Sequence, residues 1–170
     1  YVYFVTFTII DWLPVFIAPQ PVAILADSLN YCISHKHLLV NAYVIMPNHM
    51  HLIVFDADFD NTRLHQTLVE FRKFTGQKLA NYIDNHLPGS LATVIRPEGL
   101  DDRSRQIWQP GWHAEGLVSE KFWAQKMNYL HDNPVRKGFV RSAEDWRYSS
   151  AGYWFGGEVG DVQVVPVGEE

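Results

Sequence analysis

The chain has 170 residues, of which 47% are hydrophobic and 14% aromatic, and its formal net charge is -5. This composition is typical of one ordered globular domain and excludes both a disordered chain and a large two-domain enzyme. Cys32 is the only cysteine, which excludes an intramolecular disulfide and a thiolate zinc site and favours a reducing cytoplasm.

The first ten residues predict a β-strand. They are rich in β-branched and aromatic residues and end before the turn-like residues 11–14. The run is too short to span a bilayer, so we expect no membrane association. Because the sequence does not begin with methionine, we expect that a few residues precede Tyr1 in the complete protein.

A helix and a β-hairpin are predicted next. From Pro21 to Ile33 the apolar residues recur at helical spacing, and proline is well placed in a first helical turn. Residues 38–46 and 49–55 are two apolar, β-branched runs separated by Pro47 and Asn48. Two such runs around a short turn are typical of a hairpin.

The middle of the chain predicts a second helix and then a loop. Asp60 or Asn61 can cap a helix whose apolar stripe runs from Leu64 to Leu79. Residues 87–105 contain scattered proline, glycine and charged residues, so we predict a loop there, with a short strand near Thr93 as a possibility.

A last helix is predicted from Ser119, a good N-cap, to about His131, because Asn133 precedes a proline and such residues avoid helical geometry. The order β-α-β-β-α-(β)-α predicts an α+β domain over residues 1–155, with a central antiparallel sheet and helices on one face.

Residues 156–170 form an acidic C-terminal tail. They hold four acidic residues and no basic one, which leaves 14 basic against 15 acidic residues before them. Between Lys121 and Arg147 basic residues outnumber acidic ones, so the negative charge is largely local. Charge alone nevertheless favours an ordinary solvated surface over a nucleic-acid interface. The acidic residues of the tail are Glu158, Asp161, Glu169 and Glu170.

Two histidines in the second strand of the hairpin are the first candidate for chemistry. Because side chains alternate along a strand, His49 and His51 point to the same face. Such a pair can bind a metal with a third ligand, but it also occurs on exposed edge strands. The following Leu52-Ile53-Val54 does not match other hydrolase families with an H-x-H motif, and the chain is too short for an amidohydrolase barrel.

Tyr129, in the last helix, is the second candidate. Tyr129 and Asn133 are four residues apart and share a helical face, with Gln125 one turn earlier. A tyrosine in an amphipathic helix is most often a packing residue. Here another side of the helix already carries an apolar stripe, formed by Trp123, Met127 and Leu130.

At these segments the sequence resembles the REP-associated tyrosine transposases, relatives of the small single-strand transposases of bacterial insertion sequences and members of the HUH group. The M-P-N-H-x-H and Y-x-H-x-N-P-V-R motifs together are specific for that family. The matching segments occur in the expected order along the chain, at residues 3–7, 43–52, 108–109, 129–138 and 146–151.

The resemblance implies a ferredoxin-like HUH endonuclease core with a tyrosine helix beside the sheet. It makes Tyr129 the nucleophile, His49 and His51 the metal pair, and Asn133 the third ligand, although related branches place glutamine at that turn. The implied activity is metal-dependent cleavage and rejoining of single-stranded, hairpin-associated DNA through a 5′-phosphotyrosine link. Mg²⁺ or Mn²⁺ is the expected cofactor, and the active unit is a monomer or a homodimer.

Two other functions remain open from the sequence. The first is a domesticated hairpin DNA-binding protein that no longer cleaves, and the second is a general metal hydrolase. Candidate nucleic-acid-binding residues are Arg72, Lys73, Arg136, Lys137 and Arg147, with Trp146 and Tyr148 as possible stacking residues. We interpret Trp108, Trp112 and Trp123 as packing residues, and His113 and His131 as surface or supporting groups.

Overall fold

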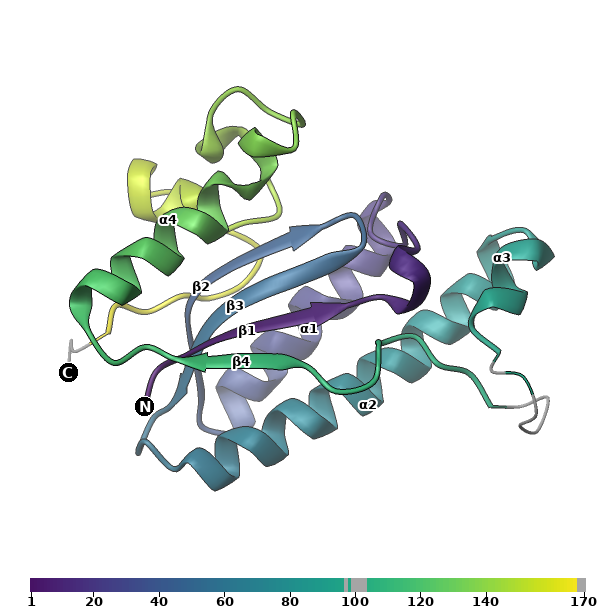
Figure 1. Cartoon of the computed structure of the whole chain (residues 1–170), viewed down its shortest axis with the longest axis horizontal. Helices are drawn as coiled ribbons and strands as arrows, with labels where there is room; N and C mark the ends of the chain where they lie inside the picture. The colour runs from purple at the N-terminus through teal and green to yellow at the C-terminus, as the bar shows by residue number, and fades with distance from the viewer. Residues whose placement is uncertain (97, 99–103, 168–170) are drawn as a thin grey trace.

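A four-stranded antiparallel sheet forms the centre of the computed structural model, which describes residues 1–96, 98 and 104–167 (Figure 1). Its strands are β1 (Tyr3–Thr8), β2 (Leu38–Met46), β3 (His49–Asp56) and β4 (His113–Gly116), in the order β2-β3-β1-β4. The helices are α1 (Pro19–His35), α2 (Asn61–His86), α3 (Gly89–Val94) and α4 (Glu120–Arg136). The short turns η1 (Ile10–Trp12), η2 (Ala143–Asp145) and η3 (Gly152–Gly156) complete the structure.

The connectivity β1-α1-β2-β3-α2-β4 with this strand order is the ferredoxin-like arrangement, which confirms the predicted α+β class. Strand β3 lies between β1 and β2, and His51 is paired with Thr6 on one side and Val44 on the other. The predicted hairpin is therefore correct. It places the two histidines on an inner strand and not on an exposed edge.

Helices cover both faces of the sheet, so the prediction of helices on one face is wrong. Helices α1 and α2 pack against the face that carries Val5, Leu52 and Val54, whereas α4 packs against the opposite face (Figure 1). That second face carries Phe4, Val44 and Ile53, which are also buried and apolar and must be covered.

Helix α4 extends beyond its predicted end. It continues through Pro134 to Arg136, and the chain reverses at Gly138, whose φ of 77° is left-handed. Proline near the end of a helix removes one hydrogen bond and leaves the remaining turns intact. Asn133 consequently lies inside the helix, and its spacing from Tyr129 is truly helical.

The other corrections fall between α2 and α4. Thr93 lies in α3, a short helix, and not in a strand. The fourth strand is instead β4, an edge strand that pairs through its backbone with β1. Its sequence, His-Ala-Glu-Gly, has no apolar alternation, so the hydrophobic pattern gave no signal for a strand.

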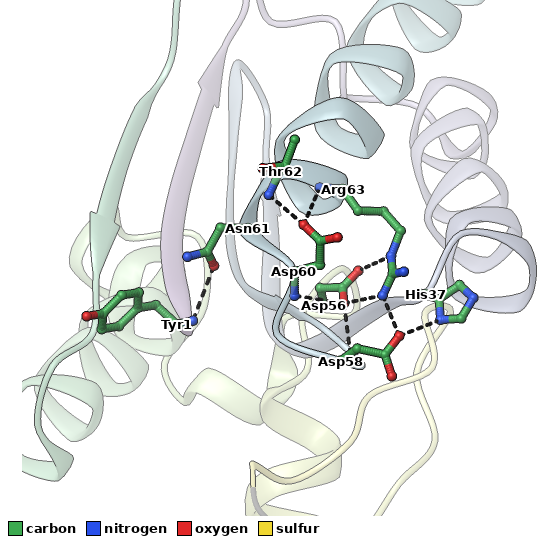
Figure 2. Close-up of polar contacts among 8 residues, drawn as sticks. All are labelled: Tyr1, His37, Asp56, Asp58, Asp60, Asn61, Thr62 and Arg63. Carbon is green, nitrogen blue, oxygen red and sulfur yellow. Dashed lines mark hydrogen bonds and ion pairs between the residues drawn. The ribbon is translucent and has the colours of Figure 1, made fainter.

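The connection from β3 to α2 is held by carboxylates (Figure 2). Asp60 caps the helix by accepting hydrogen bonds from the backbone N–H groups of Thr62 and Arg63. The buried Asp56 accepts from the backbone N–H groups of Asp58 and Asp60 and from two nitrogens of the Arg63 guanidinium. This network fixes where α2 begins.

The predicted acidic tail packs back on the domain over part of its length. Asn30 of α1 donates to the Asp161 carbonyl oxygen, Val162 is buried in the core, and the Val165 N–H donates to Val40 of β2. Glu169 and Glu170 lie outside the described residues. In the described part of the chain, no helix has the length and apolar character needed to cross a membrane.

Candidate functional site

A cavity of about 690 Å³ lies where the β2–β3 turn, the end of β1 and the last turns of α4 meet. The structure brings all four predicted catalytic and metal-binding residues to its wall. These residues are His49, His51, Tyr129 and Asn133.

The two histidine rings lie side by side on β3. Their centroids are 4.8 Å apart, and the face of the sheet that carries them is the one that packs against α4. His51 is 5% exposed and its ring stacks on Phe4 at 5.1 Å. The prediction that both rings point to the same face is confirmed.

Hydrogen bonds to their Nδ1 atoms orient the two imidazoles. His49 Nδ1 lies 2.7 Å from the Asn48 Oδ1 atom, and His51 Nδ1 lies 2.8 Å from the Thr6 hydroxyl. Because an amide oxygen only accepts, Nδ1 of His49 carries the proton and Nε2 keeps its lone pair. His51 Nε2 is buried without a hydrogen-bond partner among the described residues.

Both imidazoles are neutral at physiological pH. Burial, reinforced by the Lys137 ammonium group, lowers the pKa of His49 to about 4. Burial also lowers the pKa of His51 to about 3, with further contributions from His49, Lys126 and Arg136. A neutral imidazole is the form that binds a metal ion.

Tyr129 presents its ring to the histidines from α4. The centroids of the Tyr129 and His51 rings are 5.5 Å apart, and Phe4 contacts the tyrosine edge-on at 6.0 Å. The side chain is 42% exposed, so solvent or a substrate can reach it. Met127 and Leu130 of the predicted apolar stripe are buried in the core cluster beneath the helix.

Two cationic side chains flank the tyrosine ring. The Arg136 guanidinium carbon lies 4.3 Å from the ring centroid and the Lys126 ammonium nitrogen lies 5.9 Å from it. Lys126 is also paired with Glu115 at 2.7 Å. An anion that approaches Tyr129 therefore meets positive charge from two directions.

Asn133 lies one helical turn beyond Tyr129 and is 3% exposed. Its Oδ1 atom is buried and has no hydrogen-bond partner within the described chain. A buried carbonyl oxygen without a partner is costly, so this atom is available to accept from a group that enters the cavity.

The donor set suits a divalent metal ion. His49 and His51 offer two nitrogen lone pairs, and Asn133 offers an oxygen that lines the same cavity. Mixed nitrogen and oxygen ligands match Mn²⁺ and Mg²⁺ better than thiolate-seeking metals. Among the described residues, no cluster of three or more histidine, cysteine or acidic residues offers a competing site.

The five predicted nucleic-acid-binding residues do not gather in one place. Arg136 and Lys137 line the cavity with the histidines, whereas Arg72 and Lys73 line a separate cavity beside Trp108. Arg147 lies 3.6 Å from the Asp161 carboxylate, near the C-terminal segment.

The other singled-out aromatic and histidine residues mostly serve packing. Trp108 is buried in the core, and Trp146 donates its indole N–H to the Ile45 carbonyl. His113 is exposed on β4, whereas His131 is buried and hydrogen-bonded to Ser150 at 2.7 Å.

Sequence reasoning missed several residues that shape the cavity. Thr6 and Asn48 orient the histidines, and their positions opposite and before the pair could have suggested this. Trp12 and Phe139 line the same cavity, but nothing in their sequence context separates them from packing residues.

Two curated relatives of this chain carry the name REP-associated tyrosine transposase. The REP-associated tyrosine transposase of Escherichia coli is 25% identical over 115 residues, which covers 65% of this chain and 53% of the relative. A putative REP-associated tyrosine transposase of Haemophilus influenzae is 27% identical over 109 residues, covering 64% of this chain and 56% of the relative. The chain thus spans about half the length of the curated relatives it matches.

A solved structure shares the fold. It is described as a REP-associated tyrosine transposase bound to a REP hairpin, with a TM-score of 0.60, 19% identity, and coverage of 99% of this chain and 88% of that one. No model of a known protein family matches the chain. The resemblance to the REP-associated tyrosine transposases predicted from the motifs is confirmed by the names of both curated relatives, and the solved structure shows that the fold is shared.

Proposed function

We propose that this protein cleaves and rejoins single-stranded DNA beside a hairpin, with Tyr129 as the nucleophile and a divalent metal ion bound by His49, His51 and Asn133. The observation that carries the proposal is the meeting of Tyr129, two neutral histidines and an unpaired amide oxygen in one cavity. The related structure is described as bound to a REP hairpin, so a DNA hairpin with single-stranded flanks is the substrate we propose.

The reaction is an in-line displacement at phosphorus. The Tyr129 oxygen forms a bond to the scissile phosphate, the bond to the 3′-oxygen breaks, and the 5′ end stays attached to the tyrosine. The phenolic proton is lost to solvent and the leaving 3′-oxygen gains one, so charge and atoms balance. When bound, the metal ion supplies positive charge that polarises a non-bridging phosphate oxygen.

Side chains around the tyrosine hold the reactants in place. The rings of Phe4 and His51 fix the phenol ring against the sheet. Lys126, Arg136 and Lys137 supply positive charge to a phosphate at the tyrosine, from positions that need no rearrangement. Rejoining reverses the step when a 3′-hydroxyl attacks the phosphotyrosine, and no ATP is needed because that bond retains the energy of the phosphodiester.

The test is a search for a covalent adduct. The full chain is incubated with end-labelled hairpin oligonucleotides carrying single-stranded flanks, with Mn²⁺ or Mg²⁺, and the products are run on a denaturing gel. Tyr129→Phe removes the nucleophilic oxygen and keeps the ring contacts, so binding should persist while cleavage and adduct disappear. Tyr31→Phe, an exposed tyrosine on α1, is the matched control and should behave as wild type.

Two outcomes would replace the proposal with the other functions open from the sequence. Cleavage by Tyr129→Phe at the wild-type rate would mean that water or another residue is the nucleophile, as in a general metal hydrolase. Hairpin binding by the wild type without an adduct in either metal would mean a DNA-binding protein that no longer cleaves.

A further inference from the structure

Trp12 differs from the other tryptophans of the chain in its surroundings. It is 64% exposed and lines the cavity that holds His49, His51 and Tyr129. Each of the other five tryptophans contacts another aromatic ring, whereas Trp12 makes no aromatic contact within the described part of the chain. An exposed indole has a free energy cost that burial against a ligand would recover.

The backbone that presents Trp12 is strained. Asp11 and Trp12 have φ values of 50° and 51°, in the left-handed region that residues with a Cβ rarely adopt. Neighbouring hydrogen bonds hold this conformation in place, because the N–H groups of Ile9 and Phe16 donate to the carbonyls of Asn48 and Pro47 in the β2–β3 turn. The segment is thereby tied to the turn that precedes the metal-binding histidines.

A second exposed ring reaches the same cavity from the turn that follows α4. Phe139 follows Gly138, whose left-handed φ reverses the chain after the helix, and the Phe139 N–H donates to the Pro134 carbonyl. Its ring is 51% exposed and packs against Trp146 at 5.4 Å, which restricts its movement. The cavity thus combines two exposed aromatic rings with the cationic side chains of Arg136 and Lys137.

We propose that Trp12, with Phe139 as a second platform, stacks on nucleobases of the single strand next to the phosphate held at Tyr129. Aromatic rings interleaved with cations are the arrangement by which proteins grip single strands, the rings stacking on bases and the cations binding phosphates. Duplex DNA is a poor fit because its bases are already stacked. The inference rests on the proposed function, since it assumes that DNA occupies this cavity.

The experiment separates base stacking from phosphate binding. Fluorescently labelled dT12 and an abasic 12-mer with the same phosphates are titrated with the full chain, and the Kd of the abasic strand divided by the Kd of dT12 reports the contribution of the bases. Trp12→Ala should reduce this ratio by about 5- to 160-fold while the abasic Kd stays unchanged. Trp12→Phe should retain most of the ratio, and Phe139→Ala should reduce it to a smaller extent.

Phe59→Ala is a matched control. Phe59 is 53% exposed and also has a left-handed φ of 56°, but it lies in the β3–α2 connection, at the opposite end of β3 from the histidines. Alanine keeps a Cβ at both positions, so the backbone preference is unaltered and a difference between the variants reflects the lost ring. Phe59→Ala should match the wild type on both oligonucleotides.

An unchanged abasic-to-dT12 Kd ratio in Trp12→Ala would overturn the inference, and so would an equal loss of affinity for both oligonucleotides, which would indicate damage to the site. These results are distinguishable from failure of the proposed function. If the wild type forms the adduct and the Kd ratio is unchanged in Trp12→Ala, only the stacking inference fails. If the Kd ratio falls in Trp12→Ala but the wild type forms no adduct, stacking is supported and the proposed cleavage fails.

Discussion

Replacing Asn133 by leucine separates the metal-binding role that we propose for this residue from its role in packing. Asn133 is buried and its Oδ1 atom has no hydrogen-bond partner within the described chain. An unpaired buried acceptor costs about 1–3 kcal/mol, and an apolar side chain of similar size removes that cost. We therefore expect Asn133→Leu to raise the free energy of unfolding of the metal-free protein by about 1 kcal/mol, or about 2–4 °C in Tm for a chain of this size.

The metal-bound protein should respond in the opposite direction. Metal at 100 times its Kd stabilises the wild type by about 2.7 kcal/mol, which corresponds to about 5–11 °C in Tm. If loss of the Asn133 oxygen weakens binding about 100-fold, the same metal concentration equals the new Kd and adds only about 0.4 kcal/mol. The shift in Tm on adding Mn²⁺ should therefore shrink to about 1–2 °C.

Thermal unfolding with and without Mn²⁺ measures both quantities in one series. Asn133→Asp keeps an oxygen donor and adds a negative charge, so its metal-induced shift should equal or exceed that of the wild type. Asn128→Leu, at an exposed position on the same helix, should leave the shift unchanged. A wild-type metal shift in Asn133→Leu would show that Asn133 is not a ligand, and a destabilised metal-free variant would contradict the expectation that its Oδ1 atom is unpaired.

Two further predictions concern charge. Arg136→Gln should weaken binding of hairpin DNA and reduce the slope of log Kd against log salt by about 0.7 to 0.9, the value for one lost phosphate contact, while Lys78→Gln on α2 should leave the slope unchanged. Asp56→Asn should lower the free energy of unfolding by about 2 kcal/mol at pH 7, because the buried carboxylate accepts charge-assisted hydrogen bonds from Arg63. Although burial raises the pKa of Asp56, the hydrogen bonds from Arg63 and the backbone lower it by more, so this stabilisation is present above the unfolded-state pKa and is lost as pH falls below about 4. Urea unfolding at pH 7 and pH 3 measures the difference, and an effect of Asp56→Asn that does not shrink in acid would contradict the assignment.

Strands β1, β2 and β3 and the histidine face could be predicted because they depend on simple periodicity. Alternation along β3 alone places His49 and His51 on one face, whatever packs against it. The sequence also held a signal for helices on both faces of the sheet. The nearly continuous apolar run from Leu38 to Met46 is typical of a strand that is buried on both sides. Read as a hairpin with one buried face, that run gave the wrong layer arrangement.

The remaining errors come from features that depend on tertiary structure. Strand β4 forms by backbone pairing at the sheet edge, which needs no apolar side chains and leaves no pattern in its four residues. A proline is tolerated in the last turn of a helix when packing and hydrogen bonds stabilise that turn. Here Pro134 is itself buried, and the Lys137 N–H donates to the Asn133 carbonyl. The exposure of Trp12 likewise depends on a backbone conformation that its sequence neighbours do not specify.

The net charge of -5 does not decide whether this protein can bind a phosphate at Tyr129. Salt at physiological concentration screens exposed charges over a Debye length of about 8 Å, so the relevant charges are those around the cavity. Lys126 and Arg136 lie against the Tyr129 ring and Lys137 lines the same wall, whereas Asp161 of the acidic segment lies beside Arg147, which does not line this cavity. The electrostatic objection to a nucleic-acid partner therefore holds for the chain as an average and not for the site.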